Sequence, residues 1–332
     1  GAAWHMSDHD RVERLDREVR RRSKAPQVRG KAAIVYGQEL MWRDGALAGY
    51  RFLIDEAAAI GDAEPSDAAV CMSYASAAAA LAMRADLTLT AAQRAVTLAG
   101  SGDDLAARMV AQCALGTARQ LAGDQAAADA LLAPVEQLSV AAAEAGMAEA
   151  DHLVNSVARA HGYAERWERA IDMTSSALNR GRKAGIPDLV ASASTTLAEL
   201  AMRTGRWTEA YGLLRTTIDD PDWGIPGQRA WVQGALARIC AGLGRDEECR
   251  SAAATALEIA LPIGFTVAEA WAASALGLLE LGAGRPEAAL VHLDRVDRIF
   301  AKSHVVEPGA LWWLGDHLDA LVAVGDRARA KE

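Results

Sequence analysis

The sequence is poor in aromatic residues, and it has no long apolar run. Aromatic residues make up 5% of the 332 residues, while hydrophobic residues together make up 51%, so the apolar content is mainly Ala and Leu. These residues favour helices, and the small Ala allows close helix packing. The absence of any run of 18 apolar residues argues against a membrane-spanning helix, and no signal peptide is visible. We therefore expect a soluble, cytoplasmic protein without a membrane partner.

Cysteine is scarce, and the common catalytic motifs are absent. The four cysteines, Cys71, Cys113, Cys240 and Cys249, lie in apolar helical patterns without Cys-x-x-Cys spacing, which predicts buried free thiols. A disulfide between Cys240 and Cys249 is the weaker alternative. The sequence contains no HExxH, GxSxG, zinc spacing, dinucleotide fingerprint or GxxxxGK[ST] phosphate loop. It therefore predicts a protein that is not an enzyme and that needs no metal or cofactor.

The charge is negative overall but uneven along the chain. A net charge of −9 argues against direct nucleic-acid binding, since free-standing nucleic-acid binders are normally basic. Residues 1–31 carry nine Lys/Arg and five Asp/Glu, which leaves 26 against 39 in the rest. The opening residues 1–6, GAAWHM, are typical of a cloning remnant, and residues 7–26 are predicted to form a basic, solvated helix or linker. The domain proper is expected to span residues 27–332.

A short pattern recurs with a period near 40 residues. A Gly or other turn residue is followed, five positions on, by a small residue. The six closing small residues are Ala128, Ala170, Ala210, Cys249, Ala289 and Ala330. Their spacings of 42, 40, 39, 40 and 41 residues are hard to obtain by chance, and such self-similarity indicates a repeat array. Two weaker copies precede them, RDGALAG at 43–49 and LTLTAA at 87–92, the second with an uncertain register.

This pattern resembles the tetratricopeptide repeat, in which a turn Gly precedes a small residue of the second helix of a hairpin. The family also has a Leu followed by a small residue seven or eight positions before the turn, as in Leu115–Gly116, Leu197–Ala198 and Leu276–Gly277. The resemblance implies an all-α fold, a right-handed superhelix of about seven or eight antiparallel helix hairpins. One hairpin cannot bury its apolar face alone, so neighbouring hairpins must stack.

The long period and the Ala-rich stretch at 95–124 narrow the resemblance to large ATP-binding regulators of the LuxR type, with maltose-activator-like repeats. In that family a nucleotide-binding module precedes the repeats and a helix-turn-helix module follows them. Neither module is in this chain, and the array stops within its last second helix, so we expect a piece of a longer protein. The resemblance implies a non-catalytic sensor region for a small-molecule effector, a protein or a peptide. A passive protein–protein adaptor is the alternative, and an uncapped C-terminal hairpin also suggests a homodimer.

Two columns of the repeat register are candidate binding positions, because first helices line the concave groove in this class of repeat. One column contains His152, Ser192, Trp231, Trp271 and Trp312. Its three tryptophans are expected to form a stacked strip, which either contacts ligand or fills space between helices.

The second column lies seven residues later and contains Arg159, Glu199 and Arg238. Arginines there would hold a carboxylate or phosphate, but we favour a ladder of surface ion pairs. Asn155 and Thr195, one turn from the first column, would add hydrogen bonds to the same floor. The predicted groove residues are His152, Asn155, Arg159, Ser192, Thr195, Glu199, Trp231, Arg238, Trp271 and Trp312.

Overall fold

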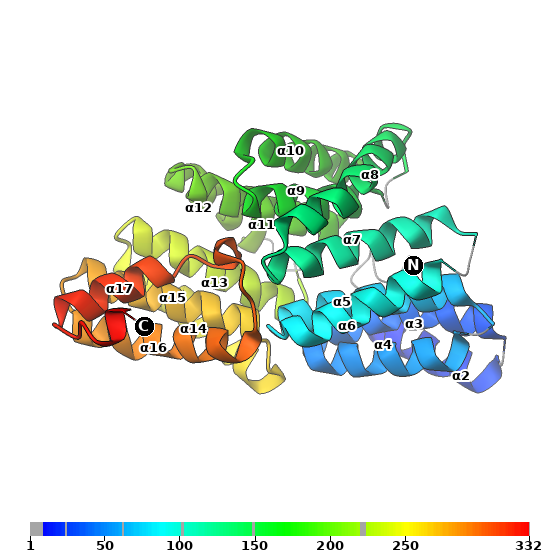
Figure 1. Cartoon of the computed structure of the whole chain (residues 1–332), viewed down its shortest axis with the longest axis horizontal. Coiled ribbons are helices and arrows are strands. Elements are labelled where there is room, and N and C mark those ends of the chain that lie inside the picture. The colour runs from blue at the N-terminus through cyan, green and yellow to red at the C-terminus, as the bar shows by residue number, and fades with distance from the viewer. Residues whose placement is uncertain are drawn as a thin grey trace.

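The computed structural model describes residues 9–23, 25–61, 63–100, 103–147, 150–219 and 224–331, and in these residues every regular element is a helix. After α2 (His9–Arg22) they form seven consecutive antiparallel hairpins and a shorter eighth unit (Figure 1). The hairpins are α3 (Pro26–Arg43) with α4 (Ala46–Ile60), α5 (Pro65–Leu81) with α6 (Ala85–Ala99), α7 (Leu105–Leu121) with α8 (Gln125–Glu144), α9 (Ala150–Tyr163) with α10 (Trp167–Ala184), α11 (Pro187–Arg203) with α12 (Trp207–Ile218), α13 (Pro226–Gly242) with α14 (Asp246–Ile263), and α15 (Thr266–Gly282) with α16 (Pro286–Ser303). The eighth unit is α17 (Leu314–Ala323) with the short 3-10 helix η2 (Arg329–Lys331). The predicted all-α array of hairpins is confirmed.

The N-terminal helix α2 packs against α3 and is less solvated than its charge suggests. Its Asp16 is buried. Arg20 donates hydrogen bonds to Asp16 and to Glu56 of α4, each at 2.6 Å, and Arg29 donates to Glu56 at 2.8 Å. Ion pairs therefore attach one face of this basic segment to the first hairpin. Residues 1–8 lie outside the described part of the chain. Among the described helices, none is both long and apolar enough to span a membrane.

The hairpin turns repeat one backbone conformation. Gly123, Gly205, Gly244 and Gly284 have φ values of 69–81°, and the second helix begins two residues after each of them. Glu165, with φ of 57°, occupies the same place between α9 and α10. At Gly123 the next amide donates to the carbonyl of Arg119 at 2.9 Å, the bond that closes a Schellman cap. Five of the predicted turns are therefore correct.

One of the predicted turns needs correction, and the last unit differs only after its turn. In the second hairpin Met83 takes the left-handed position, with φ of 54°, and α6 begins at Ala85. The small residue five positions on is Thr88, so the register read from 87–92 was wrong by about one helical turn. No Gly marks this turn, which explains the error. In the last unit Gly325 is left-handed, but η2 follows it instead of a full second helix.

The first helices form the inner layer of the array. Each first helix from α3 to α15 contacts the next first helix in the chain, in addition to second helices. Hydrogen bonds between neighbouring first helices join residues 36 or 37 positions apart: Asn155 to Ser192, Arg159 to Thr196 and Arg238 to Ser274. This offset is the repeat period less one helical turn. Residues that share a register therefore lie near one another along the inner layer.

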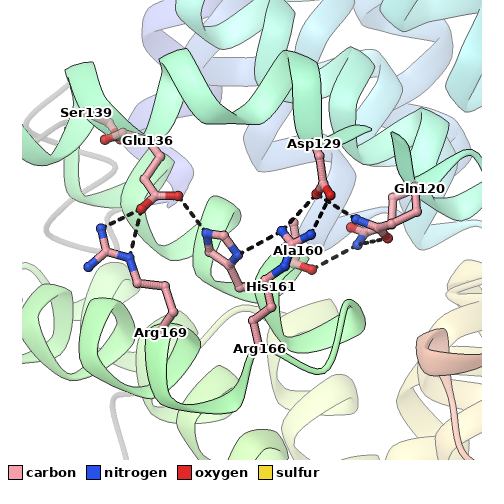
Figure 2. A network of polar contacts seen from close by, with 9 residues as sticks. Gln120, Asp129, Glu136, Ser139, Ala160, His161, Arg166 and Arg169 are labelled. Atoms are coloured by element: carbon pink, nitrogen blue, oxygen red, sulfur yellow. Dashed lines mark hydrogen bonds and ion pairs between the residues drawn. The ribbon is translucent and has the colours of Figure 1, made fainter. Parts of the chain in front are cut away.

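A polar network joins the third hairpin to the fourth (Figure 2). His161 Nε2 lies 2.6 Å from Glu136 Oε2, and Arg169 Nε donates to Glu136 Oε1 at 2.8 Å. Arg166 Nη1 donates to Asp129 Oδ1 at 2.8 Å. Burial opposes ionisation of Glu136, but the hydrogen bonds from His161 and Arg169 outweigh it and lower the pKa of this carboxyl. The network holds α8 against α9 and α10.

The array closes on itself, because the turn after α3 contacts α13 and the junction of α14 with α15. Trp42 stacks on Trp231, with ring centroids 6.1 Å apart and an interplanar angle of 13°, and its centroid lies 5.5 Å from that of Phe265. A Cβ added at Gly45 would lie 2.0 Å from the carbonyl oxygen of Ile263. In Figure 1 the blue N-terminal helices and the yellow-to-red C-terminal helices form two groups, which the green helices α8 to α12 join across the top.

All four cysteines are buried free thiols. Burial raises the pKa of Cys71, Cys113 and Cys249 to about 12 and that of Cys240 to about 11, so the thiols are protonated at neutral pH. The predicted free thiols are confirmed, and the alternative disulfide does not form.

Candidate ligand-binding site

A small cavity lies between the first helices α9 and α11. Its volume is about 10 Å³, which is room for about one water molecule. The lining residues are Arg159, Gly162, Tyr163, Thr196, Glu199, Leu200 and Arg203. Two of the predicted groove residues, Arg159 and Glu199, are therefore brought together here.

Glu199 is the buried carboxylate of this cavity. It is 6% exposed, and within the described residues its Oε1 has no hydrogen-bond partner. Burial raises the pKa of the Glu199 carboxyl, and the positive charges of Arg159 and Arg203 only partly oppose this. Burial also lowers the pKa of the Arg203 guanidinium. The cavity thus holds an acceptor that remains available to a donor group.

Arg159 links the cavity to α13. Its Nη2 donates to Thr196 Oγ1 at 2.8 Å, and its guanidinium carbon lies 4.5 Å from the centroid of the Trp231 ring, a cation–π contact. Trp231 is 8% exposed, and its Nε1 finds no hydrogen-bond partner in the described part of the chain. Four first helices therefore meet here, since Trp231 also stacks on Trp42 of α3.

Asn155 and Ser192 extend this inner surface by one turn. Asn155 Nδ2 donates to Ser192 Oγ at 2.9 Å, while its buried Oδ1 has no partner among the described residues. Thr195 is buried and donates its hydroxyl to the carbonyl of Ala191 in its own helix at 2.9 Å. His152 has a side chain that is 39% exposed, and its Nε2 lies 3.6 Å from a carboxylate oxygen of Asp188.

The expected strip of three tryptophans is wrong. Trp231 stacks on Trp42, whereas Trp271 is 3% exposed and packs against Gly234, where an added Cβ would lie 2.9 Å from the Cβ of Trp271. Both indoles are thus part of the packed core. They fill space between helices, which was the second of the two interpretations of this column.

Trp312 departs furthest from the prediction. It lies outside any helix, because α17 begins only at Leu314. The ring is 37% exposed, and the guanidinium carbon of Arg203 lies 4.8 Å from its centroid. A ten-residue connector before α17 shifts this residue off the helix face that the repeat period predicted.

The expected ladder of ion pairs is also wrong. Arg238 is 5% exposed, donates to the carbonyl of Ser274 at 2.9 Å and pairs with Asp316 at 2.6 Å. Its partner therefore comes from α17 and not from Glu199 in the same column. Arg238 is buried and Asp316 is half-buried on α17, so this ion pair holds α17 against α13.

Sequence reasoning missed three residues of this region: Trp42, Tyr163 and Arg203. Tyr163 and Arg203 each lie two positions before their turn, so a further column of the register would have found them. Trp42 has no such signal, because the closure of the array brings together positions that the repeat period does not relate.

Comparisons with known proteins show the fold. No family model matches the chain, and no curated protein matches it. Among solved structures it is similar to a Rap protein complexed with competence and sporulation factor, with a TM-score of 0.66 and 11% identity over 99% of this chain and 92% of that one. It is also similar to NprR in complex with its cognate peptide NprX, with a TM-score of 0.54 and 14% identity over 89% and 85% of the two chains.

A third similar structure is a signal transduction ATPase with numerous domains (STAND) that has a tetratricopeptide repeat sensor, from Pyrococcus horikoshii. The TM-score is 0.54 and the identity 14%, over 97% of this chain and 50% of that one. The chain thus spans half of that protein. Together with the hairpin geometry, these likenesses define the chain as a helical solenoid of the tetratricopeptide type.

Proposed function

We propose that this chain is the peptide-binding sensor region of a regulatory protein, and that an extended peptide binds along the inner layer at α9, α11 and α13. One observation carries the proposal: three predicted groove residues hold buried polar atoms that have no hydrogen-bond partner within the described residues. Asn155 Oδ1 and Glu199 Oε1 are acceptors, and Trp231 Nε1 is a donor.

A peptide backbone carries both kinds of group that these atoms lack, because each residue other than proline offers one N–H donor and one C=O acceptor. Buried polar groups are normally paired in folded proteins, so their clustering along neighbouring helices favours a ligand that supplies the missing partners. The likeness in fold to NprR, whose structure contains its cognate peptide, supports this class of ligand.

The cavity beside Glu199 does not suit a small-molecule effector. The cavity of about 10 Å³ is far smaller than the 300–1,000 Å³ or so of typical small-molecule sites. A peptide needs no such enclosed volume, because it lies along the surface of several repeats and takes hydrogen bonds from each of them.

We propose further that this sensor region belongs to a regulator of the LuxR type. The likeness to the tetratricopeptide repeat sensor of an ATP-binding signalling protein supports a sensor, while a passive adaptor is the alternative. A sensor should change its curvature when peptide binds, because a ligand shifts a conformational equilibrium only by preferring one state. Small-angle scattering of the protein with and without bound peptide separates the two roles.

The experiment for peptide binding uses the chain's two asparagines. A phage-displayed library of linear peptides is selected against the purified protein, and the selected peptides are titrated by fluorescence anisotropy. Asn155→Ala removes the inner amide and should weaken binding roughly tenfold, the effect of losing one or two hydrogen bonds. Asn179→Ala is the matched control, since Asn179 lies exposed on α10 of the same hairpin and should leave the affinity unchanged.

The melting temperature of each variant checks that the fold persists. A selection without any enriched binder would contradict the proposal. So would peptides that bind the Asn155 and Asn179 variants equally well.

A further inference from the structure

The connector between α16 and α17 is unusual in length. Residues 304–313, which we call the strap, contain ten residues and the 3-10 helix η1 (Pro308–Ala310). The other hairpins are linked by two to seven residues, from residues 185–186 to residues 219–225. Linking two stacked hairpins therefore does not require the strap's length.

One end of the strap docks on the third hairpin. The amides of Val306 and Glu307 both donate to the carbonyl oxygen of Leu121, at 2.8 and 3.3 Å. Val306 also lies against the turn after α7, where a Cβ added at Gly123 would be 3.0 Å from its Cγ1. In Figure 1 the strap is the red-brown segment that reaches from α16 toward α7. The backbone of the strap is thus hydrogen-bonded to the last residue of α7, the first helix of the third hairpin.

The other end of the strap docks beside the cavity. Arg203 donates a hydrogen bond to the carbonyl oxygen of Gly309, and its guanidinium lies over the rings of Trp312 and Tyr163, at 4.8 and 5.9 Å. A Cβ at Gly309 would lie 3.3 Å from the carbonyl oxygen of Tyr163. Because Arg203 and Tyr163 line the cavity with Glu199, the strap uses groups of the candidate site.

The strap binds as a ligand peptide would, through its own backbone N–H and C=O groups and one aromatic side chain. Its burial is uneven: Val306 is 65% exposed and Trp312 is 37% exposed, whereas Leu311 and Trp313 at its C-terminal end are buried in the core. Residues 304–310 are all exposed or half-buried, and a stretch held by few backbone bonds and by such side chains opens more readily than packed helices.

We propose that the strap is a built-in occupant of the inner surface, which an incoming peptide must displace. This inference rests on the proposed peptide-binding function and adds its regulation: the strap keeps the site closed, and its release uncovers Tyr163 of α9 and Arg203 of α11. A site that is open only part of the time binds with an apparent affinity reduced by the open fraction.

The experiment measures a labelled strap peptide, residues 302–314, binding in trans. Trp312→Ala removes the contact with Arg203 and should release the strap, so that the peptide binds the variant roughly fivefold tighter or better than it binds the wild type. Hydrogen exchange should show protected Val306 and Glu307 amides in the wild type and faster exchange in the variant. Leu314→Ala is the control, because Leu314 is 53% exposed on α17 and should change neither readout.

A second variant covers the case in which the strap stays docked after Trp312 is replaced. It replaces residues 305–310 and Trp312 by Gly and Ser at constant length and keeps Leu311, which is buried in the core. If neither variant binds the strap peptide more tightly than the wild type does, the inference is overturned. Rapid exchange of both strap amides in the wild type would also overturn it.

The outcomes separate this inference from the proposed function. One outcome is that library-selected peptides bind the wild type and the Trp312→Ala protein with equal affinity. In that case the strap is a structural link, and the peptide-binding function stands. If the strap peptide behaves as expected while the library yields no binder, docking of the strap stands and the proposed function fails.

Discussion

At the scale of single residues, the inner surface combines burial with incomplete hydrogen bonding. Glu199 illustrates how burial disfavours a charged group, since its carboxyl is buried beside two arginines and still has an elevated pKa. Burial opposes the charge more strongly than the arginine charges favour it. A site kept in this state is poised to gain from a ligand donor, and it weakens the folded protein when the ligand is absent.

Replacing Glu199 tests this balance through pH. Because its folded-state pKa is raised, the folded state binds the proton more tightly, and the stability from this group is lost as pH rises through the folded pKa. Glu199→Gln cannot ionise, so it should raise the free energy of unfolding at pH 7 by about 1 kcal/mol, the low end of the cost of an unsatisfied buried group. At a pH below the ordinary value of 4.5 the gain should vanish. Urea unfolding at both pH values measures this.

The control for that prediction is Glu258→Gln, because Glu258 is exposed on α14 and should show no comparable pH-dependent gain. A Glu199→Gln protein that is less stable than the wild type at pH 7 would mean that the arginine charges outweigh burial.

Some of these residues could be predicted from sequence, and others could not, for physical reasons. The register placed Arg159 and Glu199 on one inner surface, because the repeat period determines which residues of stacked helices face the same side. It did not give their partners, since a long side chain such as that of Arg159 reaches Trp231 two repeats away. The left-handed turn at Met83 carried no Gly signal and was missed for that reason.

At the scale of helices, close packing within a hairpin depends on a small residue in the first helix. An added Cβ at Gly37, Gly116 or Gly277 would lie 2.3–2.6 Å from the side chain of a Leu that follows 16 residues later in the second helix. The family pattern predicted small residues at 116 and 277, because the register places them between the helices. Where α17 starts could not be predicted, since the strap breaks the period.

Two glycines of α15 provide a matched test of this packing. Gly277→Ala adds a methyl group 2.5 Å from Cγ of Leu293, a residue that is fully buried. Overpacking of this kind costs about 1–3 kcal/mol, more than the ~1 kcal/mol that Ala gains over Gly in a helix, so the urea midpoint should fall. Gly282→Ala meets nothing within 4 Å and should hold or raise the midpoint. Equal effects of the two changes would refute close packing at Gly277.

At the scale of the whole molecule, closure distinguishes this array from an open superhelix. An array in which each repeat contacts only its neighbours has stability that is a sum of local terms. Here the contact of Trp42 with Trp231 and Phe265 joins the first hairpin to α13 and to the junction of α14 with α15, and the strap joins the eighth unit to the middle. Neither contact follows from the repeat period, so the closed shape was absent from the sequence-based prediction.

Removing Trp42 should therefore change shape as well as stability. Trp42→Ala deletes a partly buried indole that also covers Trp231, and we expect a loss on the order of 3 kcal/mol, the scale for such truncations. Because this indole joins distant repeats, the radius of gyration from small-angle scattering should rise above that of the wild type. Trp207→Ala is the matched control: Trp207 packs on Gly242, where a Cβ would lie 2.4 Å from its ring, a contact between consecutive repeats. That variant should lose stability while keeping the wild-type radius, and a Trp42→Ala protein that also kept it would show that closure does not depend on this contact.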